Sequence, residues 1–453
     1  MERKKRSTRS NGITRRAFVR GLAAAGLGTS ALAPAGIRPA AAQAKEITMW
    51  HWETPPNRVK VHDTIITEFK KETGITLKQV PINFPEYQQR MLAAIAAKDL
   101  PDMIQVNPPT FMTLFAHQAI IPITDIFKDI HAKVKFFEGT YRDYTLEKEN
   151  WGIPVFGVLW PLLYRQDLYQ SIGLPNGPRT WDDLLKAAKE LTKGGVYGMG
   201  LPVSTNGNYG SQNIWGFLRT HGGAIVDCQA GAEKIVFNSP RTVETYKFLA
   251  DLAQHSPPGN ENWAWSDGEL MIKAGKIAAA VFTGSFLREA DAKSPELAAK
   301  YRYAPTPVGD KDDKPLNSGY PRNVTVTRAA KEKGRMELVK TWLTWLTEPD
   351  HHASYLFMEP GLFMPMSQAS ANSKVWTEHP INKKYAALIK GQVDAMTTVS
   401  TVGFENGCHS PKAGAYEGSF LLAAVLQKVV LNKMPVQDAV AWGQAEYEKI
   451  QRS

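Results

Sequence analysis

The chain has 453 residues, 43% hydrophobic and 22% charged, which is typical of a globular protein with room for two or three domains and excludes a disordered or fibrous one. Its two cysteines, Cys228 and Cys408, exclude a disulfide-framework fold and any cysteine-rich metal site. The formal net charge is +10, but nine of the 54 Lys and Arg residues lie within residues 1–44, so the remaining chain is nearly neutral. No nucleic-acid partner is therefore expected.

The first 44 residues have the pattern of an export signal. A basic stretch leads into Arg15-Arg16, a weakly apolar run rich in Ala and Gly follows over 21–37, and the segment ends in Ala42-Gln43-Ala44. This pattern resembles a twin-arginine signal cleaved after Ala44, and it predicts export of the folded chain to the periplasm. No later stretch approaches the ~18 uninterrupted apolar residues that a membrane-spanning helix needs.

From Lys45 onward, short strands alternate with amphipathic helices. Strands are predicted at 46–50, 76–80 and 103–106. The first helix has Pro55-Pro56 near its start and stops at Gly74, and the second begins at Pro85 and ends at Pro101. Further along, Thr180 to Asp183 has capping-box spacing before a helix that ends at Gly194-Gly195, and Ser239-Pro240 starts another helix. This alternation predicts an α/β fold with parallel sheets flanked by helices, arranged in two lobes.

A series of sequence landmarks extends across residues 45–450. They are Trp50-His51-Trp52, Tyr87 to Leu92, Leu100 to Ile104, Gly152-Ile153-Pro154, Leu163 to Leu168, Gly173-Leu174-Pro175, Thr180 to Leu184, Gly275 to Val281, Gly284-Ser285-Phe286, Ser318-Gly319, Val339 to Leu346, Thr347-Glu348-Pro349 and Pro365. Their order resembles that of the extracellular solute-binding proteins of ABC importers, in the carbohydrate-type group that includes maltose-binding protein. Two of the landmarks depart from the family: Tyr164-Arg165-Gln166-Asp167 replaces Tyr-Asn-Lys-Asp, and Phe286 replaces a common Trp.

The resemblance implies two α/β lobes, each a mainly parallel sheet flanked by helices, with the ligand in the cleft between them. Lobe one is expected at 45–157 and 307–329, and lobe two at 158–306 and 330–453. The implied function is non-catalytic: a periplasmic monomer captures a carbohydrate and delivers it to an inner-membrane ABC permease. Closure of two lobes around a ligand is the motion known for periplasmic binding proteins.

Aromatic side chains in predicted loops and at strand ends supply the candidate ligand contacts. A sugar has an apolar C–H face, which a flat aromatic ring covers, and a rim of hydroxyls that amide, carboxylate and guanidinium groups bind. By contrast, Trp181, Trp342 and Trp345 on helix faces are expected to pack in the core. The candidate ligand-binding residues are Trp52, Glu53, Gln88, Asn107, Trp160, Asn208, Trp215, Trp265, Phe286 and Arg322.

Other functional classes have little support. No catalytic motif, phosphate loop or metal-ligand spacing appears, so no catalytic residue, metal or cofactor is expected. An exported enzyme stays open as an alternative because twin-arginine substrates are often oxidoreductases, and so does a polyamine or other small polar solute as ligand. Spacing leaves open whether Cys228 and Cys408 form a disulfide in an oxidising periplasm.

Overall fold

The computed structural model describes residues 45–453, which form one compact unit. The predicted export signal at 1–44 lies outside the described residues. Within residues 45–453, no helix combines the length and the hydropathy that crossing a membrane requires.

The larger of two main sheets has the strand order β14-β13-β3-β1-β2, with β4 and β7 also paired to β13. Strand β1 pairs in parallel with β2 and with β3, which confirms the three strands predicted at the start of the mature chain. The strands of this sheet are β1 (Glu46–His51), β2 (Thr76–Pro81), β3 (Met103–Val106), β4 (Ile120–Ile121), β7 (Ile153–Trp160), β13 (Asn317–Thr327) and β14 (Val399–Ser400).

Helices cover both faces of this sheet because side chains alternate along its strands. Ile47 and Met49 of β1 pack with α1, α4 and α14, whereas Ile104 and Val106 of β3 pack on the opposite face with α2 and α3. The helices are α1 (Pro56–Thr73), α2 (Phe84–Ala97), α3 (Pro108–Ala116), α4 (Thr124–Val134) and α14 (Met336–Thr347). We call this layered body lobe one.

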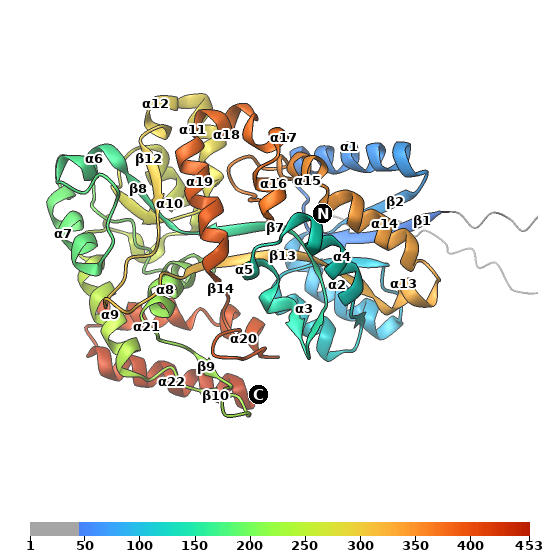
Figure 1. Cartoon of the computed structure of the whole chain (residues 1–453). Helices are drawn as coiled ribbons and strands as arrows, with labels where there is room; N and C mark the ends of the chain where they lie inside the picture. Colours follow the sequence, from blue (N-terminus) through green and yellow to red (C-terminus); the bar gives the residue numbers. More distant parts are fainter. Residues whose placement is uncertain (1–44) are drawn as a thin grey trace, which may run out of the picture. The chain divides into compact units, whose positions relative to one another are not determined.

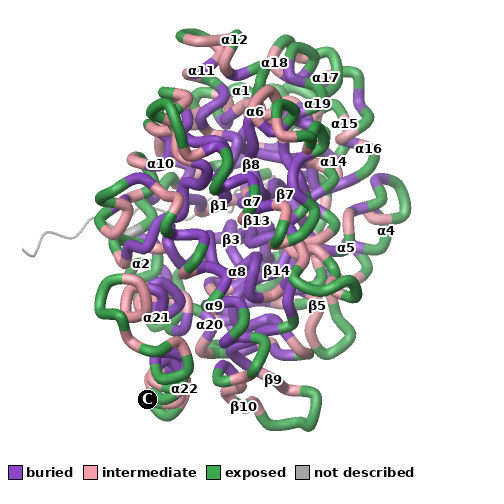
Figure 2. The backbone as a smooth tube through the Cα atoms, turned by 90° about the vertical axis from the view of Figure 1, so that its left-hand side faces the viewer, coloured by how far each residue is buried: buried purple, intermediate pink, exposed green. Residues whose placement is uncertain are grey.

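Two long antiparallel strands, β7 and β13, run from lobe one into the second half of the molecule (Figure 1). Their register extends from Val324 opposite Ile153 to Ser318 opposite Trp160, with an irregularity between Arg322 and Asn323. Nearly every residue of the two strands is buried, and Figure 2 shows buried residues concentrated along them. The two strands are therefore the crossing elements between the lobes.

The sheet of the second body, lobe two, is antiparallel rather than mainly parallel as expected. Its order is β11-β8-β12, and β8 (Leu162–Arg165) pairs antiparallel with both β11 (Ala279–Val281) and β12 (Tyr301–Ala304). The physical reason is the path of the chain. Strand β8 follows directly after β7, and β11 and β12 come after helical segments and run in the opposite direction to β8. Two further two-stranded hairpins are β5 (Thr145–Leu146) with β6 (Glu149–Asn150) and β9 (Val226–Asp227) with β10 (Lys234–Ile235).

Five long helices pack with β8 around the hydrophobic core of lobe two. They are α7 (Trp181–Leu191), α8 (Tyr209–Thr220), α9 (Pro240–Ala253), α21 (Leu421–Val430) and α22 (Val436–Arg452). The predicted starts of two are confirmed: Thr180 and Asp183 form a capping box on α7, and Ser239 caps α9 with Pro240 in its first turn. Helix α7 ends at Leu191, three residues before the predicted Gly194-Gly195 stop.

Residues 45–453 contain twelve further α-helices. They are α5 (Glu138–Tyr141), α6 (Gln166–Ser171), α10 (Trp265–Lys273), α11 (Leu287–Lys293), α12 (Pro295–Ala298), α13 (Arg328–Glu332), α15 (Pro349–Leu356), α16 (Gln368–Ala371), α17 (Lys374–Thr377), α18 (Pro380–Lys384), α19 (Ala386–Ala395) and α20 (Ala413–Gly418). The expected lobe boundaries stay a prediction; α14 contacts β1 and α15 contacts α1, so we propose that 336–356 belongs with lobe one.

Tryptophans on helix faces fill the core, as predicted. Trp342 and Trp345 of α14 are buried and pack edge-on against Phe69 of α1. Trp181 is partly exposed and stacks on Phe248 of α9, with ring centroids 4.4 Å apart. These rings pack neighbouring helices against one another.

His352 of α15 makes the stability of the fold depend on pH. Its Nε2 lies 2.5 Å from the Val155 carbonyl oxygen and its Nδ1 lies 2.6 Å from the Ser370 hydroxyl, a pattern that a neutral ring satisfies. Burial lowers the pKa of His352 from 6.5 to about 4. As the pH falls below 6.5, His352 becomes protonated in the unfolded chain, whereas in the folded chain it stays neutral until about pH 4.

We expect the free energy of unfolding to be constant with respect to this group above pH 6.5 and to fall as the pH drops toward 4. The fall should be up to about 1.4 kcal/mol per pH unit for each such histidine. Urea unfolding across this range should show a smaller fall for His352→Gln, whose amide can still donate to Val155. The exposed His117→Gln is the control and should keep the wild-type slope; an equal slope in H352Q would contradict the assignment.

Candidate ligand-binding site

A cavity of about 590 Å³ lies between α2 and α3 of lobe one and α20 with the start of α8 on the other side. Both lobes contribute side chains to its wall, as expected for a ligand enclosed between them. Its lining residues are Phe84, Tyr87, Gln88, Asn107, Pro109, Thr110, Thr113, Asn208, Gly414, Glu417, Gly418 and Phe420.

The wall from lobe one follows the carboxyl ends of β2 and β3, the edge of an open α/β sheet at which ligands bind. Asn107 follows β3 and caps α3 by accepting a hydrogen bond from the Thr110 amide at 3.0 Å. Tyr87 of α2 donates its hydroxyl to the Gln105 carbonyl at 2.9 Å. Gln88, on the same helix, is exposed and donates to the Thr113 hydroxyl at 3.4 Å. The predicted residues Gln88 and Asn107 therefore line the cavity.

Trp52 lies immediately behind this wall. Its ring packs edge-on against Phe84 and Tyr87, with centroid distances of 5.4 and 4.9 Å. The Arg322 guanidinium carbon lies 4.9 Å from the centre of the Trp52 ring. Trp52 is only 8% exposed, so in this conformation it supports the lining aromatics instead of forming the cavity surface.

A polar cluster forms the opposite wall. Asn208, at the start of α8, donates to the Tyr320 hydroxyl at 2.9 Å and to the Glu417 carboxylate, and Tyr320 donates to the same carboxylate oxygen. Burial raises the pKa of Glu417 above its ordinary value. Asn208 was predicted, whereas Glu417 and Tyr320 were missed.

Glu53 is buried beside this site and already has a cationic partner. Arg58 of α1 donates to its carboxylate at 2.7 Å, and Gln105 lies at 3.4 Å. Arg58 also donates to Glu359 at 3.1 Å. Glu53 thus lies at the predicted strand end without lining the cavity.

The other predicted aromatics occupy different places. Trp160 is buried and packs edge-on against Tyr320, at a centroid distance of 5.4 Å. Trp215 is fully buried in α8 and donates its indole N–H to the Ser400 carbonyl at 3.0 Å. Both lie next to the polar cluster and within the core of lobe two.

Trp265 and Phe286 lie away from the lining residues. Trp265 is exposed at the start of α10 and stacks on Phe282, with centroids 5.3 Å apart. Phe286 has no exposed surface and packs edge-on against Tyr301. In the described conformation, Phe286 therefore belongs to the core rather than to the cavity.

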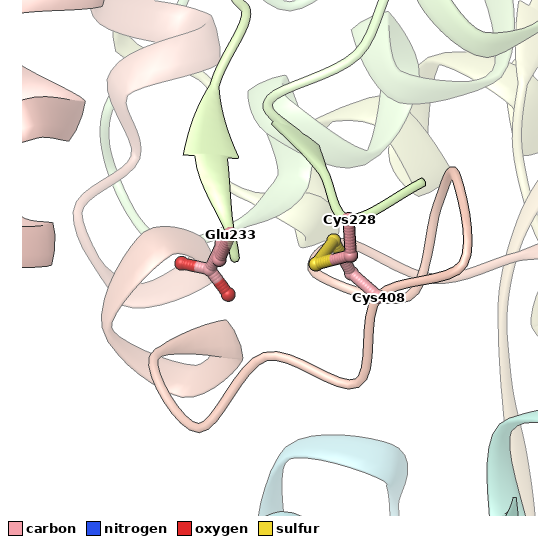
Figure 3. A group of neighbouring side chains, drawn as sticks. All are labelled: Cys228, Glu233 and Cys408. Carbon is pink, nitrogen blue, oxygen red and sulfur yellow. A yellow bond between two sulfur atoms is a disulfide. The ribbon is translucent and has the colours of Figure 1, made fainter. Parts of the chain in front are cut away.

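A disulfide fixes the loop that leads into α20. Cys228, after β9, is bonded to Cys408, which answers the question that spacing left open (Figure 3). In the same loop, the buried Glu405 accepts hydrogen bonds from the Ile225 and Val226 amides, each at 3.0 Å. The disulfide and the carboxylate together attach loop 401–412 to the β9 hairpin, and this loop delivers Glu417 to the cavity.

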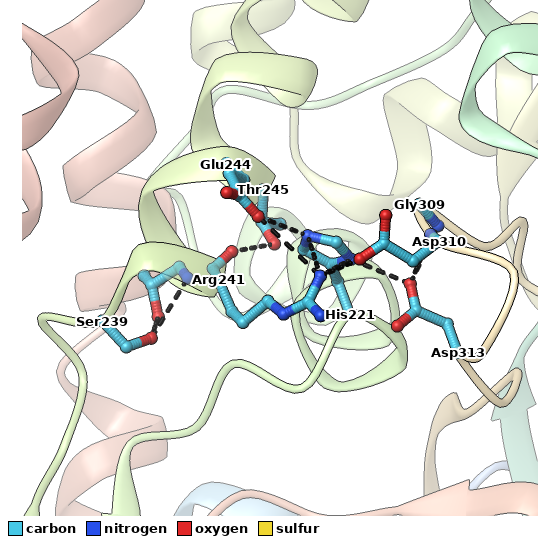
Figure 4. A network of polar contacts seen from close by, with 9 residues as sticks. His221, Ser239, Arg241, Glu244, Thr245, Gly309, Asp310 and Asp313 are labelled. Atoms are coloured by element: carbon cyan, nitrogen blue, oxygen red, sulfur yellow. Dashed lines mark hydrogen bonds and ion pairs between the residues drawn. The ribbon is translucent and has the colours of Figure 1, made fainter.

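A second polar cluster in lobe two surrounds His221 (Figure 4). The two ring nitrogens of His221 lie 2.8 Å from Asp313 and 2.9 Å from Glu244, and Arg241 pairs with Asp310. His221, Asp310 and Asp313 are close enough to bind a metal ion. However, the Arg241 guanidinium already supplies a positive charge beside these carboxylates, so the cluster does not need a metal ion. It connects α9 to loop 309–313.

Comparisons with known proteins agree with this geometry. The family model described as bacterial extracellular solute-binding protein matches residues 61–353. The predicted ABC transporter periplasmic-binding protein YcjN of Escherichia coli is 20% identical over 416 residues, 89% of this chain and 92% of that protein. The sn-glycerol-3-phosphate-binding periplasmic protein UgpB of Agrobacterium fabrum is 28% identical over 222 residues, 47% of this chain and 50% of that protein.

Solved structures share the fold at low sequence identity. The sugar-binding protein MalE from Xanthomonas citri superposes with a TM-score of 0.74 at 14% identity, covering 89% of this chain and 97% of that one. A solute-binding protein of an ABC transporter from Agrobacterium radiobacter, in complex with ribitol, gives 0.69 at 19% identity and covers 89% and 98%. The chain therefore belongs to the family of bacterial extracellular solute-binding proteins and has the two-lobed fold of its maltose-binding-protein-like structural neighbours.

Proposed function

We propose that the cavity binds a sugar or polyol in the periplasm for delivery to an inner-membrane ABC permease. The observation that carries the proposal is the composition of the cavity wall, which combines the aromatic side chains of Phe84, Tyr87 and Phe420 with the polar side chains of Asn107, Asn208 and Glu417. Aromatic rings suit the C–H face of a sugar, and the polar groups suit its hydroxyls.

The mode of action follows from the position of the cavity between lobes. A ligand that contacts both walls binds the closed arrangement better than an open one and shifts the population toward closure. The permease then has a shape by which it can distinguish loaded from empty protein. The function needs no reacting group, in agreement with a family of binding proteins.

A phosphorylated polyol is the second candidate ligand, because relatives that match half of the chain are named for binding sn-glycerol 3-phosphate. A polyamine is less favoured, since Glu417 is the one carboxylate among the lining residues that the structure describes. An exported enzyme is likewise not favoured by the cavity, where we identify no nucleophile–base pair.

A thermal-shift screen against monosaccharides, disaccharides, polyols, glycerol 3-phosphate and polyamines tests the proposal. A ligand at 100 times its Kd should add about 2.7 kcal/mol of stability. For the best ligand, Asn208→Ala should raise Kd tenfold or more, because the amide orders Tyr320 and Glu417. The exposed Asn432→Ala is the matched control. Binding of polyamines alone, or an unchanged Kd in N208A, would contradict the assignment.

We also propose that residues 1–44 direct twin-arginine export, with cleavage after Ala44. Support comes from the paired Arg15 and Arg16 in the sequence and from membership of an extracellular family. Replacing both arginines by lysine should leave unprocessed precursor in the cytoplasm, detected as a larger band in fractionated cells. Normal processing of the double variant would show that another route exports the chain.

A further inference from the structure

Arg322 is placed by the crossing strand β13 between the two walls of the cavity. Its guanidinium carbon lies 4.9 Å from the centre of the Trp52 ring and 5.4 Å from that of the Tyr320 ring. Trp52 contacts the lining residues Phe84 and Tyr87, and Tyr320 bonds to the lining residue Glu417. Arg322 is therefore separated from the lining residues by the Trp52 side chain on one side and by the Tyr320 side chain on the other.

Arg322 is a partly buried residue whose guanidinium has no hydrogen-bond acceptor among the described residues. Within residues 45–453, none of its five N–H groups donates a hydrogen bond to another residue, and Nη1 is buried without a partner. By comparison, Arg58 and Arg165 each donate to carboxylates at 2.7 Å. Unpaired buried donors are costly, and burial lowers the pKa of Arg322. An acceptor from outside the chain would remove this cost.

Nearby carboxylates leave the positive charge of Arg322 without an ion-pair partner. Glu53 is held by Arg58 at 2.7 Å. Glu417 accepts hydrogen bonds from Tyr320 and Asn208 and makes no ion pair with Arg322. Within residues 45–453, Arg322 therefore forms no ion pair with either neighbouring carboxylate.

We propose that Arg322 recognises an anionic group, a carboxylate or a phosphate, on the sugar or polyol bound in the cavity. The inference rests on the proposed function and specifies its ligand class. A guanidinium only donates, and its fork fits the two oxygens of a carboxylate or phosphate with two parallel hydrogen bonds. A neutral hydroxyl would satisfy a donor but leave the partly buried positive charge of Arg322 without a counter-charge.

The two aromatic rings prepare Arg322 for this role. A guanidinium over an aromatic face is stabilised electrostatically, and its N–H groups, which lie in its own plane, stay free for an acceptor. Trp52 and Tyr320 therefore restrict the side chain without using its hydrogen-bonding capacity. Less conformational freedom is then lost when the anion binds.

Titration calorimetry with matched pairs of probes tests the proposal on the wild-type protein. The pairs are D-glucuronate with D-glucose, D-gluconate with D-sorbitol, and sn-glycerol 3-phosphate with glycerol. We expect the charged member of at least one pair to bind tenfold or more tightly than its neutral partner. The first two pairs test a carboxylate and the third tests a phosphate, so the comparison also identifies the anion.

Variants connect the preference to Arg322. Arg322→Gln should reduce the preference for the charged probe to about twofold or less, whereas Arg322→Lys, which keeps the charge but not the fork, should retain part of it. Arg179→Gln removes a positive charge from the exposed surface and should keep the wild-type preference. Melting temperatures of all variants report whether they fold.

Two results would overturn the inference while leaving the proposed function intact. One is equal or tighter binding of the neutral probes to the wild-type protein, and the other is an unchanged charge preference in folded R322Q. Failure of every charged and neutral probe to bind would instead contradict the proposed function together with the inference. The wild-type comparison decides the matter even where a variant does not fold.

Discussion

The antiparallel pairing of β7 with β13 is the interaction on which the rest of the structure depends. The pairing joins residues that are more than 150 positions apart in the sequence, and it carries both strands through the middle of the molecule. Because alternate residues of a strand share one face, Tyr320 and Arg322 lie on the same side of β13. The crossing strand thus connects the lobes and carries two polar side chains, those of Tyr320 and Arg322, to the region beside the cavity.

Partial burial determines the cost of leaving the polar side chains of the site without a partner. Glu417, Tyr320 and Arg322 are polar groups in a partly dehydrated site, where unpaired donors and charges are expensive. Tyr320 and Asn208 satisfy Glu417, and Arg58 satisfies Glu53, whereas no described residue satisfies Arg322. A ligand that contributes an acceptor to Arg322 would remove this cost, which is the physical basis of the proposed anion recognition.

Local signals in the sequence predicted much of the fold. The capping box at Thr180, the Ser239-Pro240 start and the left-handed stop at Gly74 lie within a few residues of each helix end and depend on little else. Strand direction in lobe two was not predictable in this way, because β8, β11 and β12 pair over separations of more than 100 residues.

Site residues that follow a predicted strand were predictable, whereas residues that reach the cavity through distant contacts were not. Asn107 and Gln88 were found from the strand–helix order, and Asn208 from its loop. Glu417 lies in a short helix with no motif, and only the disulfide-bonded loop 401–412 and its pairing with Tyr320 bring it to the cavity. Composition marks aromatic residues as candidates but does not distinguish Phe286 in the core from Phe84 at the cavity.

We expect a bound solute to close the cleft between α3 and α20. A Cβ at Gly414 would lie 3.5 Å from the Cβ of Pro109, a separation that a disulfide can span. The most direct measurement is the rate at which the Pro109→Cys/Gly414→Cys variant cross-links, with and without a sugar or polyol that raises its melting temperature. Cross-linking should be faster with the solute than without it, and equal rates under saturating solute would show that the solute does not close this cleft.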